Sequence, residues 1–385
     1  MLATMKLLAW LKKDFVLVVA VTLALVSLLV VRPTMKLVIA SIDFKVLALL
    51  FCLMLVIQAF RTTNLLDYSA VRLLGICKAT RLLSFILVFL VFFLSMVITN
   101  DVALLTFVPL TIVVCQKRNI SAGTLVVLET IAANLGSSLT PMGNPQNLFL
   151  YSFYNFSTKE FFSATLIIGA VSAALLTVVL LLVRADKKSP SAEAKSTVSA
   201  MDATQLPVVK KDFWFWFYVV AFVLSLLTVF RLVDYRITLV VVICIAAICN
   251  FRLLFMVDYG LLGTFLGFFV FVGCISSVPA VAELISKSMV SPLATYITGI
   301  ATSQVISNVP ASLLLSGFAS YGKELLLAVN VGGLGTLIAS LASVISFNIY
   351  RNSNAHCCTE SFMTRFTGYN LLFLAVLAPV VWVFL

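Results

Sequence analysis

The sequence predicts an all-α polytopic membrane protein made of two inverted repeats, each with five transmembrane helices, one re-entrant hairpin and one broken helix. The first observation is composition, because hydrophobic residues make up 62% of the chain, charged residues 11%, and mean hydropathy is +1.15. A soluble domain averages about half apolar and a quarter charged residues. The second observation is a series of apolar stretches of spanning length, and the third is a set of motifs that recur on both sides of a central polar segment. This composition excludes soluble enzymes, nucleic-acid binders and disordered proteins.

Charge, cysteine and histidine content narrow the classes further. The net charge of +11 is typical of Lys and Arg gathered in cytoplasmic loops, so we expect no nucleic-acid partner. Six of the eight cysteines lie in apolar stretches and are interpreted as buried hydrophobic residues: Cys52, Cys77, Cys115, Cys244, Cys249 and Cys274. The single histidine, His356, adjoins Cys357 and Cys358. These three could bind a soft metal, but adjacent cysteines are awkward ligands and a chance cluster is favoured. We therefore expect no cofactor, and no metal beyond a transported Na⁺.

The apolar stretches define the predicted spans, because a bilayer core needs about 20 apolar residues per helix. Uninterrupted candidates are 15–31, 46–60, 83–99, 102–115, 161–183, 213–230, 237–250, 260–278 and 371–385. Three more, at 121–151, 291–320 and 324–350, are interrupted by Gly, Pro, Asn and Ser. The first span lacks a small-residue cleavage site and precedes Arg32 and Pro33, so we expect a retained helix rather than a signal peptide.

A polar segment at 184–212, rich in Lys, Ser and Ala, predicts a cytoplasmic linker between two repeats. The first repeat covers 1–183, with its hairpin at about 83–117 and its broken helix at about 121–151. The second covers 213–385, with its hairpin at about 291–320 and its broken helix at about 324–350.

The duplication itself is predicted from five motif pairs that recur in the same order, about 190 to 210 residues apart. The pairs begin at Lys12 and Lys210, Asp43 and Asp234, Asp67 and Asp258, Thr99 and Ser307, and Asn134 and Asn330. Five crossings per repeat make the second repeat insert upside down, as in many secondary transporters.

The predicted location is the cell (inner) membrane. The distribution of Lys and Arg favours a topology in which the N-terminus and the C-terminus both lie outside. Lys6, Lys12 and Lys13 then lie outside, against the trend, and Arg72 falls within a helix.

The first polar interruption is Thr99-Asn100-Asp101, between two apolar runs. An acid at membrane depth is costly and points to function. We expect a re-entrant hairpin in which Asn100 and Asp101 cap the second helix while carbonyls at the end of the first face a cation. The alternative is that both segments cross fully and Asp101 lies at the water interface.

The second polar interruption lies within the apolar run 121–151 and carries two Gly, two Pro and three Asn. Such a break is tolerated only inside protein or beside a watery cavity, where it offers carbonyls to a cation and N–H groups to an anion. A plain loop between two helices is the alternative. The second half carries two corresponding polar stretches. One resembles the Thr99-Asn100-Asp101 stretch without its acid, and the other resembles the broken helix. The alternative for these stretches is that their small residues only allow tight helix packing. The candidate substrate- or ion-binding residues are Thr99, Asn100, Asp101, Gly136, Ser137, Thr140, Gly143, Asn144, Asn147, Ser307, Asn308, Val309, Pro310, Gly332, Gly335, Thr336 and Ser340.

At these residues the chain resembles the ion transporter superfamily, which includes arsenite-efflux permeases, sodium/proton antiporters, citrate permeases and divalent anion/sodium symporters. Thr99-Asn100-Asp101 resembles the first hairpin tip, 140–147 the first broken helix, and 307–310 the second tip. The resemblance implies an inverted-repeat carrier, usually a homodimer, with a scaffold and a moving transport part. The carboxylate symporters carry Ser-Asn-Thr at both tips, whereas this chain has Asp101 and Val309 at the third positions. The Asn-Asp pair is closer to the arsenite and sodium/proton branches and counts against a dicarboxylate substrate.

The predicted function is secondary active transport of a small anion or oxyanion by alternating access, coupled to Na⁺ or H⁺. Asp101 would act as the charge switch, binding a proton when unpartnered and staying ionised beside Na⁺. A sodium/proton antiporter is one alternative, and an ion channel is another. Glu129 is either a second proton site or a paired structural carboxylate. An enzyme is not expected, because no cluster of acids, His or nucleophiles lies at membrane depth.

Overall fold

The computed structural model describes residues 15–64, 80–117, 120–183, 213–353 and 359–385, and these residues are predominantly helical. Before residue 184 the helices are α2 (Phe15–Val31), α3 (Met35–Ser41), α4 (Phe44–Thr62), α6 (Thr80–Ile98), α7 (Asn100–Lys117), α8 (Gly123–Ser137), α9 (Pro145–Phe153) and α10 (Thr158–Leu182). After residue 212 they are α11 (Phe213–Val229), α12 (Tyr235–Asn250), α13 (Tyr259–Ser276), α14 (Pro279–Lys287), α15 (Pro292–Ile306), α16 (Asn308–Ser316), α17 (Gly322–Val331), α18 (Leu341–Asn352) and α19 (Thr359–Val383). Two 3₁₀ helices, η1 (Phe251–Met256) and η2 (Leu337–Ala339), complete the described elements.

Six of the described helices are long and apolar enough to cross a membrane. They cover Phe44–Thr62, Arg81–Ile98, Thr158–Leu182, Tyr235–Met256, Tyr259–Ser276 and Phe362–Val383. Shorter apolar helices cover Val16–Val31, Asn100–Gln116 and Phe213–Val229. The prediction of an all-α polytopic membrane protein is confirmed at this level. The predicted linker at 184–212, the Lys12 and Asp67 motifs, Lys6, Lys13, Arg72, Cys77 and the trio at 356–358 lie outside the described residues.

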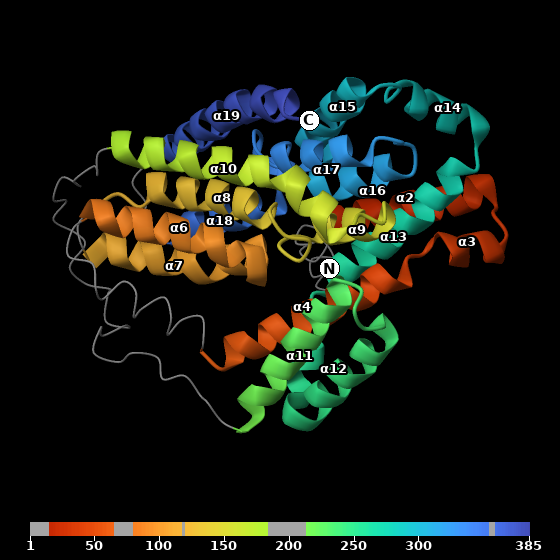
Figure 1. Cartoon of the computed structure of the whole chain (residues 1–385), viewed down its shortest axis with the longest axis horizontal. Coiled ribbons are helices and arrows are strands. Elements are labelled where there is room, and N and C mark those ends of the chain that lie inside the picture. The colour runs from red at the N-terminus through yellow and green to blue at the C-terminus, as the bar shows by residue number, and fades with distance from the viewer. Residues whose placement is uncertain (1–14, 65–79, 118–119, 184–212, 354–358) are drawn as a thin grey trace, which may run out of the picture.

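The helices form three groups that are visible in Figure 1. In one, α8 packs against α6, α7, α10, α18 and α19. In a second, α4, α11 and α12 pack against one another, and in a third, α2 lies along α13. Short helices α9, α16 and α17 lie between these groups, and α17 also contacts α8.

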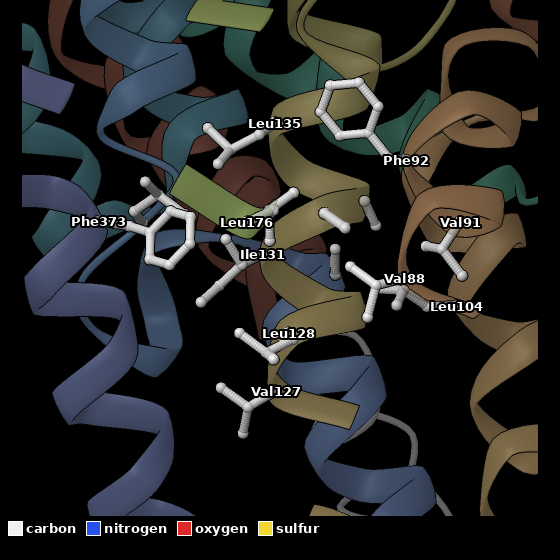
Figure 2. Close-up of a cluster of buried hydrophobic side chains, with 14 of the residues drawn as sticks. Val88, Val91, Phe92, Leu104, Val127, Leu128, Ile131, Leu135, Leu176 and Phe373 are labelled. Carbon is white, nitrogen blue, oxygen red and sulfur yellow. The ribbon is translucent and has the colours of Figure 1, made fainter. Parts of the chain in front are cut away.

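The helix α8 is surrounded by protein. Its side chains Val127, Leu128, Ile131 and Leu135 are buried in one apolar cluster that also takes residues from α6, α7, α10 and α19, as Figure 2 shows. Because this helix faces protein on all sides, polar backbone exposed at its end is shielded from lipid hydrocarbon.

Three acidic residues have a local structural role as helix N-caps. Asp43 Oδ1 accepts from the Val46 N–H at 3.0 Å, Asp234 Oδ1 from the Arg236 N–H at 2.8 Å, and Asp258 Oδ1 from the Leu261 N–H at 3.0 Å. Such caps satisfy backbone donors that have no partner within the helix. The motif pair Asp43 and Asp234 therefore marks two helix starts.

The last helix is longer than the sequence predicted. It begins at Thr359, whereas the apolar run begins at 371. Polar residues between these points hide the helix from a hydropathy scan, yet Phe362, Phe366 and Asn370 are all buried. A short helix at Pro279–Lys287, which the sequence analysis did not predict, joins α13 to α15.

Candidate functional site

The first polar interruption is a one-residue reversal of the chain. Helix α6 ends at Ile98, α7 begins at Asn100, and Thr99 between them has φ of +69°. A positive φ is uncommon for residues other than glycine. The Ala103 N–H donates to the Thr99 carbonyl at 3.0 Å, and the Asp101 N–H donates to Asn100 Oδ1 at 2.9 Å. These bonds hold the start of α7 at this reversal, the first tip.

The corresponding polar stretch in the second half of the chain repeats this geometry. Helix α15 ends at Ile306, α16 begins at Asn308, and Ser307 has φ of +75°. The Ala311 N–H donates to the Ser307 carbonyl at 3.0 Å, as Ala103 does at the first tip. The side chain of Val309 packs in an apolar cluster and Pro310 is buried, so neither supplies a polar side-chain atom at this second tip.

The first break separates α8, which ends at Ser137, from α9, which begins at Pro145. The amide nitrogen of Asn147 donates to the carbonyls of Ser137 at 3.3 Å, Ser138 at 3.0 Å and Thr140 at 3.1 Å. Asn144 caps α9 by accepting from the Asn147 N–H at 2.8 Å. Carbonyls that the break frees are thus held by a side-chain amide.

The second break lies between α17 and α18, where residues 332–336 leave helical geometry. Gln304 of α15 holds it: its amide nitrogen donates to the carbonyls of Gly332 and Leu334, both at 2.8 Å. Its Oε1 accepts from the Thr336 N–H at 2.9 Å. Gln304 was not among the predicted site residues, and the signal that could have found it is an amide one turn before the tip.

Each tip is bonded to the break of its own half. The Asn100 N–H donates to the Gly143 carbonyl at 3.1 Å, and Thr140 Oγ1 donates to the Met96 carbonyl. In the second half, Ser307 Oγ donates to the Ala339 carbonyl at 3.4 Å, and Thr336 Oγ1 to the Gln304 carbonyl at 2.9 Å.

The two breaks also meet each other through buried asparagines. Asn330 Nδ2 donates to Asn147 Oδ1 at 2.7 Å, and Asn144 Nδ2 donates to Asn330 Oδ1 at 3.2 Å. On the other side, Asn134 Oδ1 accepts from Ser340 Oγ at 2.9 Å and from Asn100 Nδ2 at 3.3 Å. Asn134 and Asn330 were noticed as a motif pair but not predicted as ligands, yet they lie at the centre of this network.

The glycines at the site allow close backbone approach. A Cβ on Gly136 would lie 2.1 Å from the Phe92 carbonyl oxygen, and one on Gly143 would lie 2.2 Å from the Ser137 carbonyl oxygen. A Cβ on Gly332 would lie 3.0 Å from the Ile300 Cα, and one on Gly333 would lie 2.8 Å from Asn308 Nδ2. Gly335 has φ of +106°, which favours glycine.

Asp101 is half-buried in the first turn of α7, and its Oδ1 is buried without a hydrogen-bond partner. The one ion pair found among the described residues joins Lys287 to Glu283 at the surface, so no cationic side chain in the described part of the chain pairs with Asp101. A proton or a cation would complete its coordination, and the positive end of the α7 dipole favours its ionised form.

The predicted candidates therefore gather at one place. Thr99, Asn100 and Asp101 form the first tip, and Ser307 and Asn308 form the second. Ser137, Thr140, Asn144, Asn147, Thr336 and Ser340 supply polar groups at the breaks. Helices α7, α9, α16 and α18 all begin here, and helix N-termini attract anions.

Comparison with known proteins agrees with this architecture. The model of the citrate transporter family matches residues 5–321. An uncharacterised transporter of Methanocaldococcus jannaschii is 32% identical over 338 residues, which are 87% of this chain and 88% of that protein. The inner membrane protein YbiR of Escherichia coli is 30% identical over 311 residues, 80% of this chain and 81% of that protein. A putative arsB transporter of Dictyostelium discoideum is 26% identical over 141 residues, covering 37% of this chain and 25% of that protein. The chain therefore belongs to the citrate transporter family of the ion transporter superfamily and is an integral membrane transporter.

Proposed function

We propose that this protein is a secondary active transporter that moves a small anion or oxyanion by alternating access, coupled to Na⁺ or H⁺. The observation that carries the proposal is the contact between the breaks, where Asn330 bonds to both Asn144 and Asn147. A polar, buried junction between two broken helices is where such carriers hold their substrate.

The two halves are proposed to be inverted repeats, and matched contacts support this. Thr140 and Thr336 each donate to a carbonyl three residues before a tip. Helix α7 packs on α18 of the other half, and α16 packs on α9 in the same crossed manner. We further propose a homodimer in the inner membrane, with both termini outside.

An anion is favoured as substrate because of the groups that remain available. The carbonyls of both breaks are already engaged by Asn147 and Gln304, which lowers their value as cation ligands. The N-termini of α7, α9, α16 and α18 contribute partial positive charge at the same place. Asn100 and Asn308 at the tips are the proposed substrate contacts.

A sodium/proton antiporter is the second candidate, and Asp101 favours it. A carboxylate with a buried, unpartnered oxygen can bind either Na⁺ or a proton, and competition between them gives exchange. A channel would differ from both, because it conducts faster than a carrier and needs no coupling gradient.

The test is uptake by purified protein in proteoliposomes. Labelled citrate, C4-dicarboxylates and arsenite are offered under an inward Na⁺ gradient, an inward proton gradient, or neither. Gradient-dependent accumulation of one anion is expected. Sodium-driven proton movement with no anion uptake would replace this proposal by the antiporter.

A variant series ties uptake to the junction. We predict that Asn330→Ala lowers anion uptake at least about tenfold, since it removes two bonds between the breaks. Thr177→Ala is the matched control, because its hydroxyl bonds only within α10, to the Ala173 carbonyl. Equal uptake by both variants would remove the junction from the substrate path.

A further inference from the structure

Glu129 is a second buried carboxyl group, separate from the tips and breaks. It lies in the middle of α8 with no exposed surface. Thr111 Oγ1 of α7 lies 2.5 Å from its Oε1, and its Oε2 is buried with no hydrogen-bond partner. Figure 2 shows that its helical neighbours Leu128 and Ile131 are packed among apolar side chains.

Among the described residues, no cationic side chain pairs with this carboxyl group. Helix α8 packs against α6, α7, α10, α17, α18 and α19. The charged and titratable side chains described on those helices are Arg81, Asp101, Cys115, Lys159, Glu160, Lys323, Glu324, Tyr350, Arg351, Arg365 and Tyr369. None of them forms an ion pair with Glu129, and the one hydrogen-bond partner of its carboxyl group is the Thr111 hydroxyl.

The contacts suit the neutral acid better than the carboxylate. An ionised group here would be a buried, unpaired charge. In the structure Thr111 Oγ1 donates to Oε1, and Oε2 is buried without a partner among the described residues. A neutral acid here buries no net charge, and its O–H group can serve as donor or acceptor.

The fold does not require an acid at this position. The alignment that pairs Asn134 with Asn330 also pairs Glu129 with Leu325, which is likewise fully buried. An apolar side chain thus fills the corresponding place in the second half. Buried polar groups can often be replaced by apolar ones without loss of stability, so packing does not explain this acid.

Glu129 is linked to the candidate site through both helices that hold it. Along α8 it lies five residues before Asn134, about 7.5 Å at the helical rise. Its bonded partner Thr111 is on α7, which starts at Asn100. The next residue, Thr130, bonds to Ser346 of α18 at 2.8 Å, and α18 begins just after Ser340. A change in the protonation of Glu129 would therefore act on α7, α8 and α18, three helices that form the site.

We propose that Glu129 binds and releases the proton that couples transport, with Thr111 holding its carboxyl group. This inference rests on the proposed transport function and names its coupling ion and residue. Water on one side delivers the proton and an O–H bond forms at the carboxylate. After the conformational change that bond breaks and water on the other side takes the proton, with no redox step.

The first experiment needs no substrate. Infrared difference spectra of the purified protein between acidic and alkaline buffer report protonated carboxyl groups. A pH-dependent band is expected in the protein, absent from Glu129→Gln and retained in Glu160→Gln, an exposed carboxyl-to-amide control on α10. A band that is unchanged in Glu129→Gln, or one that never responds to pH, overturns the proposal.

The second experiment measures coupling with whichever of citrate, C4-dicarboxylate or arsenite is transported. The ratio of proton-driven uptake to substrate exchange is expected to fall at least about tenfold in Glu129→Gln. Thr111→Val should shift the pH midpoint of uptake, while Thr111→Ser, which keeps the hydroxyl, should restore it. Full proton-driven accumulation by Glu129→Gln overturns the coupling role.

Two further results distinguish a failure of the coupling role of Glu129 from a failure of the transport proposal. Glu129→Leu, the side chain of the second half, is expected to be at least as heat-stable as the parent protein but uncoupled. A large loss of stability would instead assign Glu129 a structural role. If no anion in the panel is transported, the transport proposal fails, and the infrared result still decides whether Glu129 exchanges a proton.

Discussion

At the scale of single residues, two side-chain amides hold the carbonyls of the breaks. The sequence led us to expect free carbonyls that face a cation. Instead Asn147 collects three carbonyls in the first half and Gln304 collects two in the second. In both places a side-chain amide donates to carbonyls that the break frees from the helix.

This arrangement makes a prediction for Gln304. Replacing it with Leu leaves the Gly332 and Leu334 carbonyls without their partner, and each unsatisfied buried group costs about 1–3 kcal/mol. We expect Gln304→Leu to melt well below the parent protein in detergent and to lose uptake. Gln58→Leu, on α4 outside both breaks, is the control. Equal melting of the two variants would contradict the role given to Gln304.

At the scale of elements, the hydrophobic pattern predicted most of the spans, and clustered Gly, Pro and Asn predicted where they break. Those residues are local signals, since each changes backbone geometry at its own position. The partner of each break could not be predicted in the same way. Gln304, Asn134 and Asn330 matter because of tertiary contacts between segments far apart in the chain. The start of α19 was missed because polar residues lower the hydropathy there, although Phe362, Phe366 and Asn370 on the same turns are buried against protein.

The contact between α6 and α8 can be tested through one glycine. We predict that Gly136→Ala destabilises the fold by several kcal/mol, because its Cβ would meet the Phe92 backbone at 2.1 Å and backbone cannot give way as a side chain can. Gly368→Ala on α19 is the matched control, since nothing lies within 4 Å of its Cβ. Alanine there should stabilise by up to about 1 kcal/mol through helix propensity. Thermal unfolding of both variants would check the contrast, which fails if the two melt alike.

At the scale of the whole molecule, the halves share a framework but differ in charge. Both tips reverse the chain at one residue of positive φ, and Thr140 and Thr336 bond to corresponding carbonyls, whereas the acids Asp101 and Glu129 are aligned with Val309 and Leu325 of the second half. Proton or cation chemistry is therefore proposed to belong to the first half, and the second half contributes substrate contacts and packing.

Such a division requires energetic coupling across the junction, which a double-mutant cycle measures. Asn144 and Asn330 share a hydrogen bond at 3.2 Å, and both are buried. Contacting residues of this kind show interaction energies of about 0.5–3 kcal/mol, so the combined Asn144→Ala and Asn330→Ala protein should lose less stability than the two single losses summed. Asn144→Ala combined with Thr177→Ala should be additive, because Thr177 bonds within its own helix. Additivity in both cycles would mean that Asn144 and Asn330 are not energetically coupled. Alternating access would then need a different contact to couple the two halves.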